Sequence, residues 1–349
     1  MDRISYLTRR LLLVIPTFIG ITIVCFSLTR LLPGGPVELK LMQMRGVASG
    51  GETAAGGSAN ASGVTEEYRK QLEKQYGFDK PLHVQYWDWL VVNRMGMKLE
   101  SYSYPNKTAW ELIKGRIPVS VWFGLSAFLL TYLICIPLGI AKALRHRQAF
   151  DAGSSLVVFI AYAIPSFALA MGLKMLFCGM LDGGWEFFPL GGISTDFGSE
   201  PTFWVWFKDR AWHMFLPVLC YVAGSFAMLT LLMKNSLLDQ ISADYVRTVI
   251  AKGGTRKRAI WCHAFRNALI PIATGLGGII GLLFAGSIII ESIFDINGMG
   301  LLSWNALNGR DYPVFLALLA LTASIQLVGN IISDVLYMVI DPRIDFSKK

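Results

Sequence analysis

Residues 244–254 read DYVRTVIAKGG and lie between two long apolar runs, at 212–233 and 269–290. Each run is long enough to cross the hydrocarbon core of a bilayer as a helix, which needs about 20 residues. A charged loop between two such runs indicates a membrane protein. This loop is the starting point for predicting both the fold and the function.

The loop itself predicts two short helices around a glycine break. Ser242 is a candidate N-cap for the first helix, and Asp244 lies in its first turn, where the helix dipole favours an acid. Gly253 and Gly254 end that helix, because glycine tolerates the left-handed cap conformation. Thr255 is a candidate N-cap for the second helix.

An apolar stripe follows the first short helix. Its members fall at positions i, i+1, i+4 and i+5 and therefore share one face: Tyr245, Val246, Val249 and Ile250. A polar loop at a membrane surface rarely needs such a stripe. The stripe must be covered by its own helix bundle, by the lipid interface or by a partner protein, and the residues alone leave these alternatives open.

The composition also favours a membrane protein. Hydrophobic residues make up 54% of the chain and charged residues 16%, against about 25% charged residues in an ordinary soluble domain. The net charge of +8 agrees with bases gathered in cytoplasmic loops, so nucleic acid is not an expected partner. The five cysteines and four histidines are scattered, so neither a disulfide framework nor a metal site is predicted.

Six apolar runs are candidates for membrane spans: 11–32, 119–141, 154–177, 212–233, 269–290 and 313–340. Pro165 interrupts the third run, and Lys174 near its outer end is expected to snorkel to the interface. The short inner segments are rich in bases and the outer loops after the third and fifth runs are rich in acids. The predicted fold is an all-α polytopic membrane protein with six transmembrane helices and cytoplasmic N and C termini.

The chain divides into four predicted parts: an N-terminal transmembrane helix (1–32), an external region (33–117), a core of five transmembrane helices (118–340) and a cytoplasmic tail (341–349). The external region holds a Gly/Ala/Ser-rich insert at 46–63 without periodicity, which is typical of a flexible segment. The core carries the cytoplasmic loop at 234–267.

The sequence contains no nucleotide-binding motif. The pattern G-x-x-x-x-G-K-[ST] does not occur, so ATP-driven transport would need another polypeptide. In the sixth run Gln326, Asn330 and Asp334 recur every four residues and share one helix face. Two interpretations stay open: these side chains line a translocation path, or they lock the bundle through interhelical hydrogen bonds.

The central loop resembles the coupling loop of the permease subunits of binding-protein-dependent ABC importers, in particular the oligopeptide and dipeptide permeases. The pattern D-Y-V-R-T-x-x-A-K-G is present at 244–253, and H-x-x-R-N-A-x-x-P is present at 263–271. The same branch is matched by PGGP at 33–36, YGFDKP at 76–81, RDYPV at 310–314 and DPRI at 341–344. The broader family has Glu-Ala-Ala where this chain has RTV at 247–249.

The resemblance implies the type I ABC importer permease fold and a loop that docks on an ATPase subunit. The implied docking residues are Asp244, Tyr245, Val246, Arg247, Val249, Ile250, Ala251, Lys252, Gly253, Gly254, His263, Arg266 and Asn267. The alternative for this loop is a basic helix pair held on anionic lipid.

The resemblance also implies partners. They are a second homologous permease, two ATPase subunits that carry ATP and Mg, a periplasmic peptide-binding protein at the external loops, and membrane lipid. This chain itself would bind no cofactor and would perform no catalysis.

The insert at 46–63 is similar to that of the Yej-type permease branch, which is associated with uptake of oligopeptides and microcin C. The implied function is import of oligopeptides, including peptide–nucleotide antibiotics such as microcin C, across the bacterial inner membrane. Two alternatives stay open. One is the same architecture importing another solute such as nickel complexes. The other is an ion-driven secondary transporter, which usually shows acidic residues near mid-bilayer and inverted repeats.

Overall fold

The computed structural model describes residues 3–31, 69–74, 78–181, 184–195, 201–275 and 286–340. Several sequence features lie outside these residues: the PGGP segment at 33–36, the insert at 46–63, most of the glycine-rich part of the fifth apolar run, and the tail from 341. The predicted division into four parts stays a prediction.

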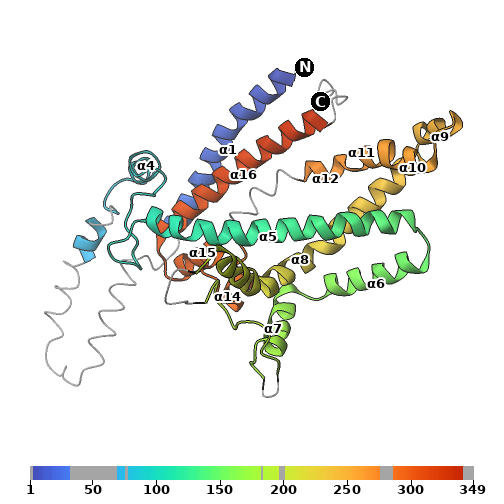
Figure 1. Ribbon diagram of the computed structural model, residues 1–349. Coiled ribbons are helices and arrows are strands. Elements are labelled where there is room, and N and C mark those ends of the chain that lie inside the picture. Colours follow the sequence, from blue (N-terminus) through green and yellow to red (C-terminus); the bar gives the residue numbers. More distant parts are fainter. Residues whose placement is uncertain are drawn as a thin grey trace. The chain divides into compact units, whose positions relative to one another are not determined.

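The described part of the chain is helical, with two isolated β-bridges and no strand. This confirms the all-α class. The elements in Figure 1 are α1 (Arg3–Leu31), α4 (Leu82–Trp87), η1 (Asp88–Val92), α5 (Ala109–Leu144), α6 (Ala149–Ala163), α7 (Ser166–Phe177), α8 (Phe203–Ser242), α9 (Asp244–Ala251), α10 (Arg256–Arg258), η2 (Ala259–Ala264), α11 (Phe265–Ala268), α12 (Ile270–Thr274), α14 (Ile288–Ile293), α15 (Met299–Asn308) and α16 (Tyr312–Ile340).

Four of the described helices are long and apolar enough to cross a membrane: α1, α5, α8 and α16. A fifth span is present if α6 and α7 count as one, although a bend of 93° separates them. Pro165 lies at this break as the N-cap of α7, where its ring is compatible with a helix start but not with a continuous helix. The interruption predicted at Pro165 is confirmed, and a count of six spans stays a prediction.

The long helices exceed the predicted spans. The apolar run at 119–141 lies inside α5, and the run at 212–233 lies inside α8, which continues to Ser242. Apolar periodicity marks the part of a helix that lipid or core covers, whereas the backbone stays helical until a residue adopts another conformation. In α8 that residue is Ala243, which is extended at ψ 148°.

The chain forms two compact units, each with its own core. Unit 1 comprises Met1–Leu13, Arg116–Leu302 and Ile325–Lys349. One of its apolar clusters joins α5, α7, α8 and α14 around Phe123, Cys220 and Ile290. A second cluster joins the loop at 234–267 to α5 and α8.

Unit 2 comprises Val14–Gly115 and Ser303–Ser324. Its core brings α1 beside α16, with Phe26 of α1, Trp89 of η1 and Leu316 of α16 packed together (Figure 1). Tyr86 of α4 is linked to α1 by a 2.9 Å hydrogen bond between its hydroxyl and that of Thr22.

Lys174 has a partner within the chain, and its predicted snorkelling to the interface stays a prediction. Its Nζ donates to the backbone carbonyl of Ile293 and lies 5.8 Å from the ring centroid of Phe294. The lysine therefore caps the end of α14 within unit 1. Its position in the sequence could not indicate this, because Ile293 is far away along the chain.

A buried aspartate holds the loop at 101–103 against the start of α16. Asp311 is 1% exposed and accepts hydrogen bonds from the Ser101 hydroxyl and from the backbone N–H groups of Tyr102 (3.1 Å) and Ser103 (3.2 Å). The carboxylate thus fixes the loop at 101–103 within unit 2.

Replacing Asp311 with alanine should release this loop, since three donors would lose their acceptor and each buried unpaired donor costs about 1–3 kcal/mol. We expect tryptic cleavage at the nearby Lys107 to become about tenfold faster or more. The exposed Asp79 in the same unit provides the control D79A, for which no change is expected. Equal cleavage rates for D311A and the parent would contradict the anchoring role.

Candidate functional site

The first short helix of the loop at 234–267, α9, follows α8 after a single residue. Its N-cap is Ala243, which provides no side-chain cap. The prediction that Ser242 caps α9 is wrong: Ser242 is still part of α8, and its hydroxyl donates to the carbonyl of Asp239 at 2.9 Å. Asp244 lies in the first turn as predicted and approaches Arg247 at 3.6 Å, with both side chains largely exposed.

The glycine break is confirmed and has a defined geometry. Gly253 adopts φ +88°, a left-handed conformation, and its N–H donates to the carbonyl of Ile250 at 2.9 Å. At Gly254 an added Cβ would lie 2.7 Å from the carbonyl oxygen of Val249. Thr255 caps the second helix as predicted, since its hydroxyl accepts from the N–H of Arg258 at 3.3 Å. The turn between α9 and α10 therefore depends on glycine at two adjacent positions for two different reasons.

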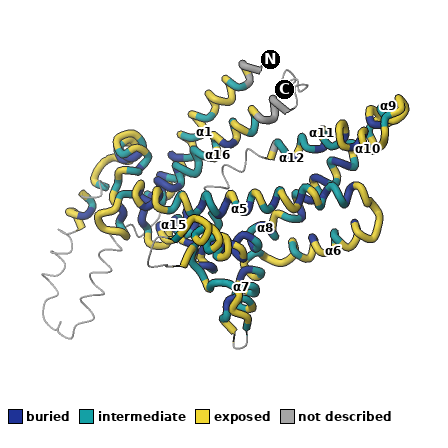
Figure 2. The backbone as a smooth tube through the Cα atoms, viewed as in Figure 1, coloured by how far each residue is buried: buried dark blue, intermediate teal, exposed yellow. Residues whose placement is uncertain are grey.

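The apolar stripe of α9 is divided between two environments. Val246 is 2% exposed and packs with Leu237 of α8 and Ala264 of η2, and Val249 is partly buried against the same cluster. Tyr245 and Ile250 are 36% and 44% exposed. One half of the stripe is thus covered by the chain's own bundle, and the other half is free to meet lipid or a partner. Figure 2 shows that most of α9 is exposed.

The second helix is longer than predicted. It runs continuously through α10, the π-helical turn η2 and α11. Its small residues Ala259, Ala264 and Ala268 are buried, and the Ser236 hydroxyl of α8 donates to the carbonyl of Ala268 at 2.8 Å. Small side chains allow this helix to approach α8 closely, so the C-terminal part of α8 packs with α9, η2 and α11 in one apolar cluster.

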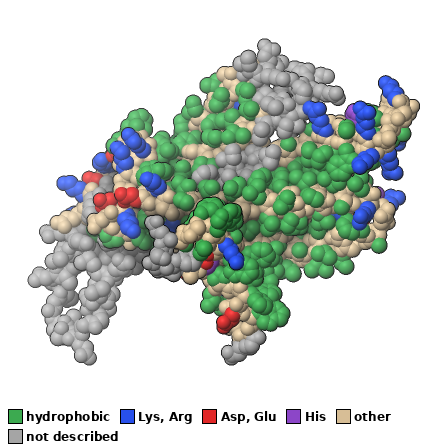
Figure 3. Space-filling view, viewed as in Figure 1, with side chains coloured by type: hydrophobic (Ala, Val, Ile, Leu, Met, Phe, Trp, Pro, Cys, Tyr) green, Lys and Arg blue, Asp and Glu red, His purple; other side chains and the backbone are tan. Residues whose placement is uncertain are grey.

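Basic side chains gather over the end of unit 1 that carries α9 and α10 (Figure 3). Exposed members of this surface are Arg247, Lys252, Arg256, Lys257, Arg258 and Arg266, with His263 exposed beside them. Asn267, the last of the predicted docking residues, is only partly exposed, and Ala251 is exposed at the end of α9. The surface combines positive charge with the apolar side chains of Tyr245 and Ile250.

Trp261 was not singled out by the sequence. It lies in η2, is 44% exposed and contacts Phe265 in a tilted arrangement, with 5.4 Å between ring centroids. With Lys257 and Arg258 it lines an open hollow of about 380 Å³. A large aromatic residue exposed among bases within the loop was the signal that could have identified it, since such residues are enriched where proteins meet partners.

The polar residues of α16 do not all face one environment. Gln326 donates to Asn330 at 3.1 Å within the helix, at an exposed position. Asp334 forms an ion pair with Arg10 of α1, with 3.3 Å between Nε and Oδ2. This pair favours the helix-locking interpretation for Asp334, while the path-lining interpretation stays open for Gln326 and Asn330.

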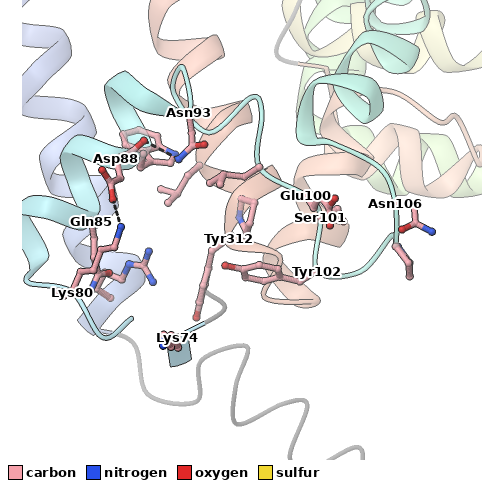
Figure 4. Close-up of a pocket in the computed structure, with 16 residues that line it drawn as sticks. Lys74, Lys80, Gln85, Asp88, Asn93, Glu100, Ser101, Tyr102, Asn106 and Tyr312 are labelled. Carbon is pink, nitrogen blue, oxygen red and sulfur yellow. Dashed lines mark hydrogen bonds and ion pairs between the residues drawn. The ribbon is translucent and has the colours of Figure 1, made fainter. Parts of the chain in front are cut away.

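Unit 2 contains a polar pocket of about 590 Å³. The Lys80–Asp88 ion pair (2.7 Å) lies at one side of this pocket in Figure 4, and Glu100 lies at the other. Arg30 also lines it, with its guanidinium 4.3 Å from the Phe78 ring centroid and 5.0 Å from that of Phe26. Unit 2 therefore offers a surface hollow that carries charges of both signs.

The fold and the loop define an integral-membrane transport subunit, and comparison with known proteins agrees. A profile of the family described as binding-protein-dependent transport system inner membrane component matches residues 135–346. This chain belongs to that family. The family consists of transport permeases, so the chain is a multi-pass inner-membrane transport subunit whose family works with ATPase and substrate-binding partners.

Relatives match along almost the whole chain. The chain is 39% identical to the inner membrane ABC transporter permease protein YejB of Escherichia coli O157:H7, over 98% of this chain and 99% of the relative. It is 36% identical to the peptidoglycan transport system permease protein YejB of Agrobacterium fabrum, over 99% of each. It is 31% identical to the dipeptide transport system permease protein DppB of Escherichia coli K12, over 99% of this chain and all of the relative. The predicted resemblance is confirmed.

Proposed function

We propose that this chain is the permease subunit of an ATP-driven importer that carries peptides across the bacterial inner membrane. The observation that carries the proposal is α9: a short helix joined directly to membrane-spanning α8, with one half of its apolar stripe packed on the bundle and the other half exposed beside bases. A helix that is fixed on one side and open on the other is suited to receive a partner protein.

The proposed mechanism is rigid-body alternating access. An ATPase subunit holds α9 in a groove, with Tyr245 and Ile250 in contact with apolar residues and the surrounding bases in contact with acidic or polar ones. Closure of the ATPase pair on ATP displaces α9. Because α9, η2, α11 and α8 share one apolar cluster, the membrane helix moves with the loop, and the bundle changes from inward-open to outward-open.

The proposed assembly contains a second homologous permease, two ATPase subunits and a periplasmic peptide-binding protein. ATP and Mg belong to the ATPases. Six spans with both termini in the cytoplasm agree with this assembly, because that topology puts α9 and its bases on the ATPase side. The same topology puts the predicted external region at 33–117 on the side of the binding protein.

The names of the relatives support peptides as the substrate class. They include dipeptide, oligopeptide and peptidoglycan transport systems. Peptidoglycan fragments also carry peptide chains, so we propose a peptide moiety as the shared chemistry. The peptidoglycan relative makes cross-linked or sugar-bearing peptides a specific second candidate.

The decisive experiment is a pull-down of the tagged chain from membranes in which the neighbouring genes are expressed, followed by an ATPase assay of the eluate. We expect recovery of a second permease and ATPases, with ATP hydrolysis raised by binding protein plus peptide. Recovery of this chain alone after gentle solubilisation would contradict the proposal. Uptake that stops when the proton gradient is collapsed at constant ATP would favour the ion-driven alternative.

Replacing Ile250 with glutamate should separate docking from folding. The side chain is 44% exposed, so the substitution should leave the thermal unfolding of the chain unchanged within about 0.5 kcal/mol. It should also reduce the amount of co-purified ATPase by about tenfold or more. The reason is that a buried unpaired carboxylate at an interface costs about 2 kcal/mol or more. V92E, at an exposed valine in unit 2, is the control. Normal ATPase recovery with I250E would show that Ile250 is not part of the surface that binds the ATPase.

A further inference from the structure

A buried cluster of charges lies where α5, α6 and α8 meet in unit 1. Lys142, in the last turn of α5, is 0% exposed. Its Nζ donates to the hydroxyls of Ser155 (2.7 Å) and Ser154 (3.0 Å) and to the carbonyl of Asp151 (3.1 Å), all in the first turns of α6. Every donor of this ammonium is therefore directed at α6.

Asp151 lies between two lysines. Lys234 of α8 donates to its Oδ2 at 2.9 Å, and Lys234 Nζ and Lys142 Nζ lie 2.8 Å and 3.3 Å from its Oδ1. The N–H of Arg147 donates to Oδ2 at 3.3 Å, and His146 Nδ1 lies at the same distance. The carboxylate is 9% exposed and thus joins three helices with little access to water.

Stability alone does not explain this cluster. Two ammonium groups and one carboxylate leave an excess positive charge in a buried place, and burying charges costs more than packing apolar residues of the same size. Buried charges are best attested where they fix one arrangement of helices among several.

The cluster lies next to the body that carries α9. Leu237, one turn after Lys234 on α8, packs with Val246 of α9, and Ala143, next to Lys142 on α5, joins the same cluster. Ser236, two residues after Lys234, holds α11. A displacement of α9 that moves the end of α8 must therefore act on Lys234, and through Asp151 on the start of α6.

We propose that Asp151, held between Lys142 and Lys234, is the positioning residue that makes α6 follow α8 and α9. The inference rests on the proposed docking of α9 to an ATPase, and it adds the route by which that movement reaches the bent α6–α7 segment. Apolar contacts between helices allow sliding, whereas charge-assisted hydrogen bonds have directions. The cluster thus fixes the position of α6 relative to α8.

The test is the assembled complex in proteoliposomes with D151N. Asparagine keeps the shape and removes the charge. We expect the ratio of peptide imported to ATP hydrolysed to fall about tenfold, which is within the range of coupling effects between sites. E73Q makes the same chemical change in the exposed Arg69–Glu73 pair of unit 2 and should leave the ratio unchanged.

A distance measurement separates positioning from a merely structural role. Spin labels at Val157 on α6 and Thr248 on α9, both exposed, would be placed in a C262S background because Cys262 is exposed too. In the parent the label distance should stay constant between nucleotide-free and ATP-bound states. In D151N it should change between these states.

If D151N fails to assemble, the triple variant K142M/D151L/K234M tests the positioning role of Asp151 without leaving a buried charge unpaired. It removes all three charges and keeps apolar volume, so we expect it to assemble and to remain uncoupled. Normal coupling in the triple variant, or a normal ratio in D151N, would overturn the inference. A parent complex whose ATPase activity does not respond to binding protein and peptide would instead overturn the proposed function.

Discussion

Replacing Gly253 with valine is expected to leave the chain inserted in the membrane and to uncouple ATP hydrolysis from transport. Gly253 has φ +88°, and no heavy atom lies within 4 Å of an added Cβ. The effect would therefore come from backbone strain alone, and not from a collision. A β-branched residue in this conformation costs about 2 kcal/mol, which the loop can relieve by releasing the end of α9.

A released α9 no longer has one orientation relative to α8. We expect the ratio of transported peptide to hydrolysed ATP to fall about tenfold or more in proteoliposomes. G253N should lie close to the parent, since asparagine tolerates the left-handed region. G115V adds the same side chain at an exposed glycine of α5 with open space around it and serves as the control. Normal coupling in G253V would refute the hinge at this position.

Replacing Glu291 with alanine should destabilise the fold strongly. Glu291 is 1% exposed, and its carboxylate accepts from the N–H groups of Ser287 (3.0 Å) and Leu301 (2.7 Å). A Cβ at Gly298 would lie 2.7 Å from the Glu291 carboxyl group, and one at Gly300 would lie 3.1 Å from it. The carboxylate is therefore tightly surrounded by backbone atoms, and its hydrogen bonds link α14 to α15. Alanine would leave at least two buried donors unpaired, at a cost of about 3 kcal/mol.

The pH dependence of stability gives this prediction a second readout. Glu291 lies outside the helices long enough to span a membrane, and burial raises its pKa from 4.5 to about 7. Between these values the folded chain binds more protons than the unfolded chain, so stability decreases as pH rises through this window, by about 3 kcal/mol at most.

Thermal unfolding in detergent at about pH 5 and about pH 8 measures the contribution of Glu291 to the pH dependence of stability. We expect E291A to lose more stability at the lower pH, because in the parent at the higher pH the ionised carboxylate already carries its desolvation cost. E291Q retains a hydrogen-bond acceptor and cannot ionise, so it should lose less stability and lack the Glu291 contribution to the pH dependence. An unfolding midpoint of E291A equal to that of the parent at both pH values would exclude the structural role.

The sequence alone was sufficient where the cause of a structure is local or periodic. Long apolar runs predicted α1, α5, α8 and α16, Pro165 predicted the break between α6 and α7, and Gly253 and Thr255 predicted the turn after α9. Each of these depends on a residue and its near neighbours. The same local stretch carried the family resemblance, which the comparisons confirmed.

The N-cap rule failed at the end of α8, because this helix continues beyond the predicted span at 212–233. Ser242 has the right chemistry for an N-cap, but it is still helical at the end of α8, and its hydroxyl bonds to the carbonyl of Asp239. The extended residue is Ala243, whose type gives no such signal. Periodicity could not indicate where α8 ends, because apolar residues continue through Leu237 and Ile241 and resume at Tyr245 after a single extended residue.

Only the tertiary structure decided which side chains meet across the chain. Tyr245, Val246, Val249 and Ile250 have the same period, yet α8 covers Val246 and leaves Ile250 exposed. Lys142, Asp151 and Lys234 come from three helices, and Arg10 and Asp334 from the two ends of the chain. Spacing along a sequence places a residue on a face of its own helix, but the partner of that face depends on how the helices pack.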